Sequence, residues 1–284
     1  MKLSKLTFAA LLLFASTPLA LAQGTYTQID VPGASQTQCW GINTAGDVTG
    51  SYETASGWHG FLLSGGIFTY IDFGTNFNTF LYAINDVGQI AGGTSSPNGF
   101  VYDIATQTFT DISYPGAVVS TATSINNAGR VAGFFALEHG IYSRNHGFVF
   151  QNNQFGVIVH PGWDNTDVWG EAESGVLVGN GSGTSFRFRQ GTFYPITIPN
   201  EPNYVAYGIN SAGTAITGVY SPSSGSQVGF IYQNQVFQPL QFPGYPYTYA
   251  FSSNASGVVA GVFQDGAYVS HGFTWTPPAD AAKK

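Results

Sequence analysis

The stretch GINTAGDVTGSYETASGWHGFLLSGGIFTYIDFG, residues 41–74, decides the fold. It contains three landmarks in order: an Asn-x-x-Gly turn at residues 43–46, a His-Gly-Phe triplet at residues 59–61, and an alternating run that starts at Phe68 and stops at Gly74. Four short strand-like runs fit into such a unit, and none has the length or the 3.6-residue period of a helix. Because a unit this short cannot cover its own apolar faces, it predicts a repeat protein.

The unit recurs six times along the chain, with the same three landmarks in the same order. The alternating runs start at Tyr26, Phe68, Phe109, Phe155, Phe193 and Phe237. The turn glycines are Gly46, Gly88, Gly129, Gly175, Gly213 and Gly257, so the period averages about 42 residues. The triplets start at His59, Asn98, His146, Val228 and His271, and repeat four has Ser185 before Phe186. This period is typical of one four-stranded propeller blade.

These observations predict an all-β chain that forms a six-bladed β-propeller with four-stranded antiparallel blades. Asn-x-x-Gly fits a hairpin turn whose glycine takes a positive φ, so it joins two antiparallel strands. The chain opens with the alternating run at residues 26–31 and closes with a His-Gly-Phe strand near Phe273. We therefore expect the N-terminal strand to complete the last blade, which protects the sheet edges.

The repeats resemble the bacterial extracellular HAF-type repeats, which have a His-Ala-Phe triplet where this chain has His-Gly-Phe. GINTAG at residues 41–46 and HGFLLSGG at residues 59–66 carry the resemblance, which covers the whole mature chain expected from Gln23 onward. Repeat four departs from the pattern, because it lacks both the turn asparagine and the histidine. The resemblance implies a secreted, propeller-like repeat protein and brings no catalytic residue with it.

The first 22 residues have the features of a secretory signal peptide. Lys2 and Lys5 precede an apolar run, and small residues stand just before Gln23. We expect cleavage near Ala22, one propeller domain over residues 23–278, a disordered tail over residues 279–284, and a secreted product that is extracellular or periplasmic. No run is long enough for a transmembrane helix.

The composition argues against nucleic acid as a partner and against a disulfide as a source of stability. The chain has a net charge of −7, and removal of the leader takes away two lysines, so nucleic acid is not an expected partner. Cys39 is the only cysteine, so no intrachain disulfide can form. We expect a monomer that packing alone stabilises.

Candidate ligand-binding residues lie where repeats three and four depart from the pattern, since repeat scaffolds carry function in their irregular loops. The second loop of repeat three is extended, and repeat four is rich in carboxylates and tryptophan. Exposed aromatic rings can stack on sugars or partner chains. The predicted ligand-binding residues are Glu138, His139, Trp163, Asp164, Asp167, Tyr245 and Tyr247. We expect them on the face where the loops after Pro-Gly emerge.

Other polar and aromatic residues have structural interpretations. His59, His146 and His271 occupy equivalent positions, which lie too far apart in a propeller to bind one metal, and we expect them to bond to backbone. Trp40 and Trp169 are expected to begin innermost strands as buried core residues.

Two function classes stay open. The sequence favours a secreted, non-enzymatic binding scaffold whose ligand is a carbohydrate or a protein, with no cofactor and no metal. The alternative is a propeller lyase or hydrolase with a metal or carboxylate site near the central channel. No Gly-x-Ser-x-Gly elbow, His-Glu-x-x-His motif or phosphate loop is present, so no catalytic residue can be named.

Overall fold

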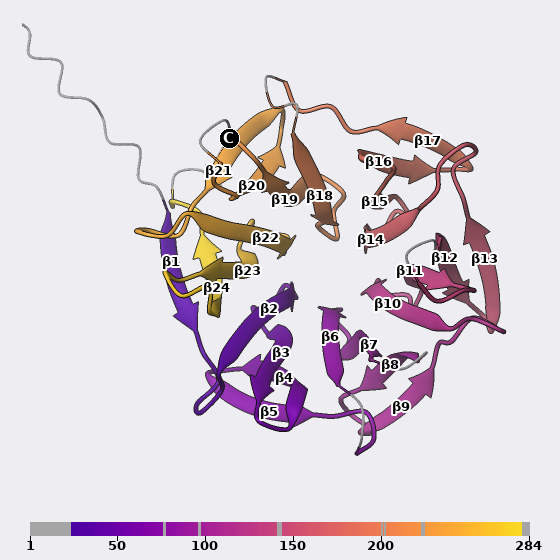
Figure 1. Cartoon of the computed structure of the whole chain (residues 1–284), viewed down its shortest axis with the longest axis horizontal. Helices are drawn as coiled ribbons and strands as arrows, with labels where there is room; N and C mark the ends of the chain where they lie inside the picture. Colours follow the sequence, from indigo (N-terminus) through magenta and orange to yellow (C-terminus); the bar gives the residue numbers. More distant parts are fainter. Residues whose placement is uncertain are drawn as a thin grey trace, which may run out of the picture.

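The computed structural model describes residues 24–75, 78–95, 98–140, 144–199, 201, 203–222 and 225–279. The predicted signal peptide and the last five residues of the predicted tail lie outside these ranges. Within them the chain forms 24 strands in six four-stranded sheets and contains no helix. The described part of the chain accordingly has no helix that could cross a membrane. The sheets stand as blades around a common centre (Figure 1), so the predicted six-bladed propeller is confirmed.

Each of the first three blades runs outward from the centre in chain order. Blade one consists of β2 (Gln36–Ile42), β3 (Val48–Thr54), β4 (Gly57–Ser64) and β5 (Ile67–Ile71). Blade two consists of β6 (Thr79–Ile84), β7 (Gln89–Thr94), β8 (Gly99–Asp103) and β9 (Thr108–Asp111). Blade three consists of β10 (Val119–Ile125), β11 (Val131–Ala136), β12 (Asn145–Gln151) and β13 (Gln154–Ile158).

The remaining blades follow the same plan, except that the last one combines both ends of the chain. Blade four consists of β14 (Asp167–Glu171), β15 (Leu177–Gly181), β16 (Thr184–Arg189) and β17 (Thr192–Pro195). Blade five consists of β18 (Tyr204–Ile209), β19 (Ala215–Tyr220), β20 (Val228–Gln233) and β21 (Val236–Leu240). Blade six consists of β22 (Tyr247–Ser253), β23 (Val259–Gln264), β24 (Ser270–Thr276) and β1 (Thr25–Ile29).

Strand β1 closes the ring by pairing with β24, as the sequence predicted. The two strands are antiparallel, with Thr25 opposite Thr276 and Ile29 opposite Gly272. The ring of Tyr26 packs against Phe273, at 5.6 Å between centroids, and against Phe242 of the neighbouring loop, at 5.3 Å. Blade six therefore depends on residues from both ends of the chain.

The Asn-x-x-Gly segments form the expected hairpin turns between the first two strands of a blade. In blade one the N–H of Gly46 donates to the carbonyl of Asn43 at 3.1 Å, and the Asn43 side chain accepts the N–H of Asp47 at 2.9 Å. Gly46 has a φ of +89°. Repeat four keeps the turn without its asparagine, because the N–H of Gly175 still donates to the carbonyl of Ala172.

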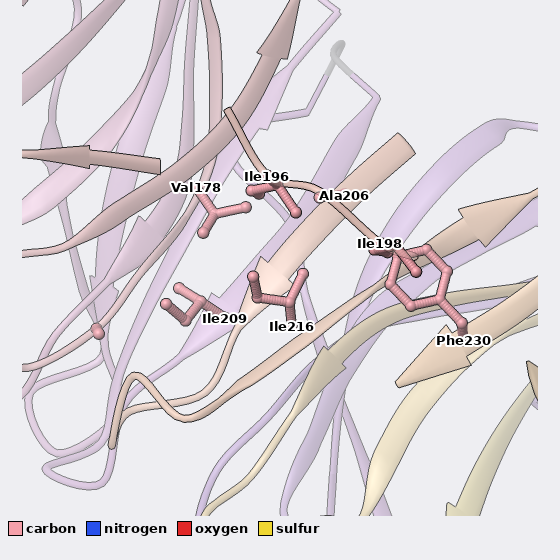
Figure 2. Packing of buried hydrophobic residues seen from close by; sticks show 8 residues of the cluster. Val178, Ile196, Ile198, Ala206, Ile209, Ile216 and Phe230 are labelled. Atoms are coloured by element: carbon pink, nitrogen blue, oxygen red, sulfur yellow. The ribbon is translucent and has the colours of Figure 1, made fainter. Parts of the chain in front are cut away.

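Apolar side chains fill the space between neighbouring blades. The cluster in Figure 2 joins Val178 of blade four to Ile209, Ile216 and Phe230 of blade five, all fully or almost fully buried. Each blade thus covers the apolar face of the next, which is the packing that the repeat length predicts.

The repeat histidines do not bond to backbone as predicted. Nδ1 of His59 lies 2.9 Å from Oδ2 of Asp72, and Nδ1 of His271 lies 3.0 Å from Oδ1 of Asp30. In both blades the aspartate immediately follows the outermost strand, so the pair fastens the third strand to the fourth. At His59 and His271 a carboxylate contact between the third and fourth strands replaces the predicted backbone bond.

Candidate functional site

A cavity of about 100 Å³ lies on the propeller axis, among the six innermost strands. All six blades contribute to its lining, and in Figure 1 the strands β2, β6, β10, β14, β18 and β22 surround the centre. Its lining residues belong to the ends of these strands and to the turns that follow them. Exposed turn residues, including Thr44, Asp86 and Glu173, form its rim.

Five aromatic side chains line the inner part of the cavity, and we call them the aromatic girdle: Trp40, Tyr82, Trp169, Tyr207 and Phe251. Each sits at the β-bulge of its innermost strand, where the pairing register shifts by one residue. A bulge turns an extra side chain out of the regular alternation. The repeated bulge therefore gives each of these blades one ring at the axis.

The girdle rings contact one another across four blade boundaries. Ring centroids are separated by 5.4 Å for Trp40 and Tyr82, 4.2 Å for Trp40 and Phe251, 5.2 Å for Tyr207 and Phe251, and 5.8 Å for Trp169 and Tyr207. These spacings are those of interacting aromatic pairs. The girdle is thus continuous from blade four, through blades five, six and one, to blade two.

Blade three interrupts the girdle, because its bulge residue is Thr123. The Thr123 hydroxyl donates to the carbonyl of Val168 at 2.8 Å, which ties blade three to blade four. The cavity is therefore asymmetric, with aromatic rings on five sides and a small hydroxyl-bearing residue on the sixth.

Small residues follow the bulge in every repeat: Gly41, Ala83, Ser124, Gly170, Gly208 and Ser252. Gly208 shows the reason, since a β-carbon there would lie 2.3 Å from the carbonyl oxygen of Phe251. The innermost strands approach one another too closely for a larger side chain.

A belt of hydrogen bonds links the turns around the rim of the cavity. The backbone N–H of Thr44 donates to Asp86 at 2.8 Å, that of Asp86 donates to the side chain of Asn127 at 2.8 Å, and that of Asn127 donates to Glu173 at 2.9 Å. The N–H of Glu173 then donates to the carbonyl of Ser211 at 2.9 Å. Blades one to five are therefore joined at this rim, with two carboxylates held in place.

Glu171 is the one carboxylate in the cavity wall that is buried, with no side-chain exposure. It occupies the position that isoleucine holds in four other repeats. Its Oε1 lies 3.0 Å from an Arg130 nitrogen and accepts a bond from the Asn126 amide at 3.3 Å. Burial raises the pKa of Glu171 to about 7, an effect that Arg130 reduces and Glu173 increases.

Several buried polar atoms of the lining have no hydrogen-bond partner within the described structure. They are Oε2 of Glu171, Nε1 of Trp40, Nε1 of Trp169, and the hydroxyls of Ser252 and Ser253. Buried polar groups are normally paired, so each unpaired group indicates a missing partner. These five atoms all belong to residues that line one cavity, which makes it the candidate site.

The charge of the cavity is one-sided. Asp86, Glu171 and Glu173 line it, and no lysine, arginine or histidine of the described chain does. Partial burial alone would raise the pKa of Asp86, but hydrogen bonds from Thr44 and Asn127 outweigh that effect and lower it. Asp86 is therefore ionised at neutral pH.

The predicted residues of repeats three and four lie on the opposite face. The Asn-x-x-Gly turns at the cavity rim join the first strand of each blade to the second. The predicted residues lie in or beside two other kinds of loop, those that join the second strand to the third and those that join one blade to the next. Glu138 and His139 are exposed in the loop after β11. Asp164 is exposed and pairs with Arg144 at 3.3 Å. The Trp163 ring stacks on His160 at 3.8 Å and packs in its own blade.

The other predicted residues, Asp167, Tyr245 and Tyr247, do not form a single site with the residues just described. Asp167 begins β14, where burial raises its pKa and a 2.7 Å hydrogen bond from Asn145 opposes that change. Tyr245 packs against Phe263 at 4.8 Å, and Tyr247 lies beside Tyr268 at 5.8 Å, both in blade six. The structure thus places Trp163 and Asp164 in the loop that leads into blade four, where Asp167 begins β14, and leaves the tyrosines at blade six. That these residues bind a ligand stays a prediction.

Trp40 and Trp169 lie on innermost strands as expected, but the expectation that they begin those strands as buried core residues is wrong. They are half-buried and stand at bulges near the ends of β2 and β14. A signal for the girdle existed in the sequence, because an aromatic residue precedes the turn asparagine position by three residues in five of six repeats.

In blade one a serine, a histidine and an aspartate lie in hydrogen-bond contact, but we interpret the contact as structural and not as a catalytic triad. Oγ of Ser56 lies 2.8 Å from Nε2 of His59, whose Nδ1 contacts Asp72. Blade six repeats the arrangement with Asp265 in place of the serine, at 3.7 Å from His271. The shared role is to fasten a loop to the outer strands.

Among the residues that the structure describes, no group of three or more histidine, cysteine, aspartate or glutamate side chains could hold a metal ion. Burial raises the pKa of the Cys39 thiol, and Cys39 is fully buried. It is therefore unsuited to act as a nucleophile.

Comparison with known proteins identifies the fold and no family. No protein-family profile matches the chain, and no curated protein sequence matches it. Solved structures resemble it at low identity. A triple arginine-to-alanine mutant of AofleA from Arthrobotrys oligospora superposes with a TM-score of 0.54 and 12% identity, over 89% of each chain.

Two further structures show the same architecture. TolB from Acinetobacter baumannii has a TM-score of 0.53 and 13% identity over 86% of this chain, which spans 64% of the TolB chain. An oligogalacturonate lyase in complex with manganese has a TM-score of 0.51 and 12% identity, over 92% of this chain and 98% of that one. At such identities the likeness shows the propeller fold alone.

Proposed function

We propose that this chain is a binding protein whose ligand occupies the axial cavity through the rim of Asn-x-x-Gly turns. One observation carries the proposal: six repeats place their bulge residues and turns around a single cavity, and buried polar atoms there lack partners. A cavity of about 100 Å³ has room for roughly three water molecules or one small organic group. The proposed ligand is therefore a small molecule or the end of a larger one.

A small-molecule panel tests this proposal. Purified protein lacking the leader would be screened with monosaccharides, amino acids and alkylamines by saturation-transfer NMR. The variant Ser211→Trp places a large ring at the rim and should abolish binding of every molecule that enters the cavity. Glu138→Ala and Asp164→Ala alter exposed residues of the opposite face and should leave that binding unchanged.

The same variants test the face that the sequence favoured. If binding were lost in Glu138→Ala or Asp164→Ala and kept in Ser211→Trp, the ligand site would lie on the loop face and the axial proposal would be wrong. A carbohydrate or protein ligand at Trp163, Asp164 and Asp167 would then be the better account. An absence of binding by the whole panel would also count against the axial site.

We also propose that the chain is exported and belongs with the HAF-type repeats. The charged and apolar start of residues 1–22 supports export, and the GINTAG and HGFLLSGG segments support the kinship. N-terminal sequencing of protein collected outside the bacterial cytoplasm should give a chain that starts at Gln23. An unprocessed N-terminus would contradict export by this route.

A further inference from the structure

The side chains around the axial cavity select for one sign of charge. Asp86 and Glu173 are held at the rim by the hydrogen-bond belt, and Glu171 stands in the wall. Arg130 contacts Glu171 but does not line the cavity. A positively charged guest would therefore meet the rim carboxylates of Asp86 and Glu173 and the Glu171–Arg130 pair, whereas the rim would repel an anionic guest.

The aromatic girdle favours an organic cation over a hydrated metal ion. Ammonium groups with alkyl substituents bind over the faces of clustered aromatic rings, which is the basis of aromatic cages for quaternary ammonium ligands. Five of the six bulge positions carry such rings, and adjacent rings are in contact. A metal ion would need a set of oxygen or nitrogen ligands that the described residues do not provide together.

Two further observations agree with an ammonium guest. Oε2 of the fully buried Glu171 side chain has no hydrogen-bond partner among the described residues, and Glu171 belongs to the lining of the cavity. The cavity, at about 100 Å³, is somewhat smaller than a roughly 150 Å³ cavity that admits benzene, so a group of about five heavy atoms is the right size.

We propose, on the basis of the axial binding function, that the natural ligand carries a small alkylated ammonium group and has a net positive charge. The girdle surrounds the alkyl groups, and the carboxylates of Asp86, Glu171 and Glu173 neutralise the charge. Glu171 makes repeat four the repeat that specifies the cation, because the other repeats have an uncharged residue at this position.

The test compares two probes of the same shape that differ in charge. Choline and its neutral isostere 3,3-dimethylbutan-1-ol would be titrated into the protein, and the tryptophan fluorescence of the girdle would be followed. Choline should bind at least about tenfold more tightly than the alcohol, since both the ring faces and the carboxylates distinguish a cation from a neutral group. Equal binding would overturn the cation proposal while leaving the axial binding function intact.

Failure of the binding function gives a different result. If choline and the alcohol both fail to bind while another panel molecule binds and is blocked by Ser211→Trp, the cation proposal is wrong and the axial binding function stands. If no panel molecule binds, or if Ser211→Trp binds choline and the alcohol as tightly as the natural chain does, the axial site itself is excluded. Phosphocholine tests whether the ammonium belongs to a headgroup with a phosphate, and it should bind more weakly than choline because the rim is acidic. Tighter binding of phosphocholine would contradict a ligand of net positive charge.

Matched variants assign the effect to individual groups. Asp86→Asn keeps the hydrogen-bond acceptor of the belt and removes one charge, so choline affinity should fall about fivefold or more while the alcohol is unaffected. Asp103→Asn removes the same charge from the exposed outer part of the same blade and should change neither affinity. Tyr207→Leu keeps an apolar side chain but removes a ring, and choline affinity should fall roughly two- to fivefold.

Glu171 adds a pH signature that a merely structural residue would not give. A bound cation favours ionised Glu171, so binding below its pKa must release a proton, and choline affinity should rise as the pH increases from 5.5 to 8. Arg130 and Glu173 are the charged groups near Glu171, and burial raises the pKa of Tyr82 and Tyr207, so both stay neutral in this range. A pH-independent affinity, or one that is unchanged in Glu171→Gln, would exclude the role of Glu171.

Discussion

Single glycines decide how each blade packs. In all six repeats the glycine of the second strand faces the ring of a fully buried phenylalanine in the third strand, as Gly92 faces Phe100. A β-carbon at Gly92 would lie 2.5 Å from the carbonyl oxygen of Phe80 and 2.6 Å from the Phe100 ring. The phenylalanine ring of each repeat therefore fits only because the facing residue of the second strand is glycine.

Replacing Gly92 by alanine tests this requirement. We expect the free energy of unfolding to fall by about 1–3 kcal/mol or more, because overpacking forces backbone and ring to move. Gly93→Ala is the matched control, since the nearest atom to its β-carbon would be Cγ2 of Thr121 at 3.4 Å. Urea denaturation of both variants measures the difference. Equal stabilities would show that the repeat glycine is not a packing residue.

Buried Glu171 makes stability depend on pH in a predictable direction. Its pKa is about 7 in the folded chain against an ordinary value of 4.5, so the folded state holds the proton more tightly. The contribution of this group is therefore fully present below about pH 4.5 and is lost as the pH rises through 7, by on the order of 3 kcal/mol at about 1.4 kcal/mol per pKa unit.

Comparison with Glu171→Gln isolates that contribution. The glutamine keeps an acceptor for Asn126 but does not titrate, and Arg130 is partly exposed and can be solvated. The stability of the natural chain relative to the variant should fall between pH 4.5 and 7.5, as measured by urea denaturation at each pH. A constant or rising difference over this range would show that burial does not dominate at Glu171.

At the level of whole strands, β1 is the element on which closure depends. It covers the edge of β24 and places Tyr26 against Phe242 and Phe273. Removal of residues 1–31 should expose this edge and lower the thermal midpoint sharply, with aggregation seen by size-exclusion chromatography. Removal of residues 1–23 is the control and should leave both properties unchanged.

A peptide of residues 24–31 offers a second readout for the same strand. If β1 acts by completing blade six, the peptide should bind the truncated protein and restore its thermal midpoint. A truncated protein as stable as the control would show that five complete blades and a three-stranded sixth are sufficient.

For the whole molecule, a closed ring of blades has no intrinsic start. Thr25 and Thr276 are paired neighbours at the ends of β1 and β24, so a short hairpin can join them as the Ser64-Gly65-Gly66 turn joins β4 and β5. A permuted chain that opens in the loop between β9 and β10 would have six blades of continuous sequence.

We expect this permuted chain to fold and keep the axial cavity, with a lower thermal midpoint because no blade then combines both ends of the chain. Circular dichroism and choline titration measure the two properties. If the permuted chain failed to fold, closure of blade six by a strand from the other end of the chain would be required to form the ring, and not only to stabilise it.

The number of blades, their four-strand plan and the pairing of β1 with β24 could all be predicted from the amino-acid sequence. The first two follow from local turn chemistry at Asn43 and its equivalents, from strand alternation and from the regular period of about 42 residues. The pairing of β1 with β24 follows from the strand types that open and close the chain. It also pointed to repeat four as the irregular repeat, but it placed the candidate site at Trp163 and Asp164, on the loop face.

Only the tertiary structure decided that Trp40, Tyr82, Trp169, Tyr207 and Phe251 meet at one axis, and that Glu171 lies among them with Arg130 at its side. Residues about 42 positions apart become neighbours only when the ring closes, and the bulge that turns each ring inward leaves no mark in the alternation of a single strand. The asymmetry of the cavity, with Thr123 on one side and a buried carboxylate beside it, is therefore a property of the assembled blades.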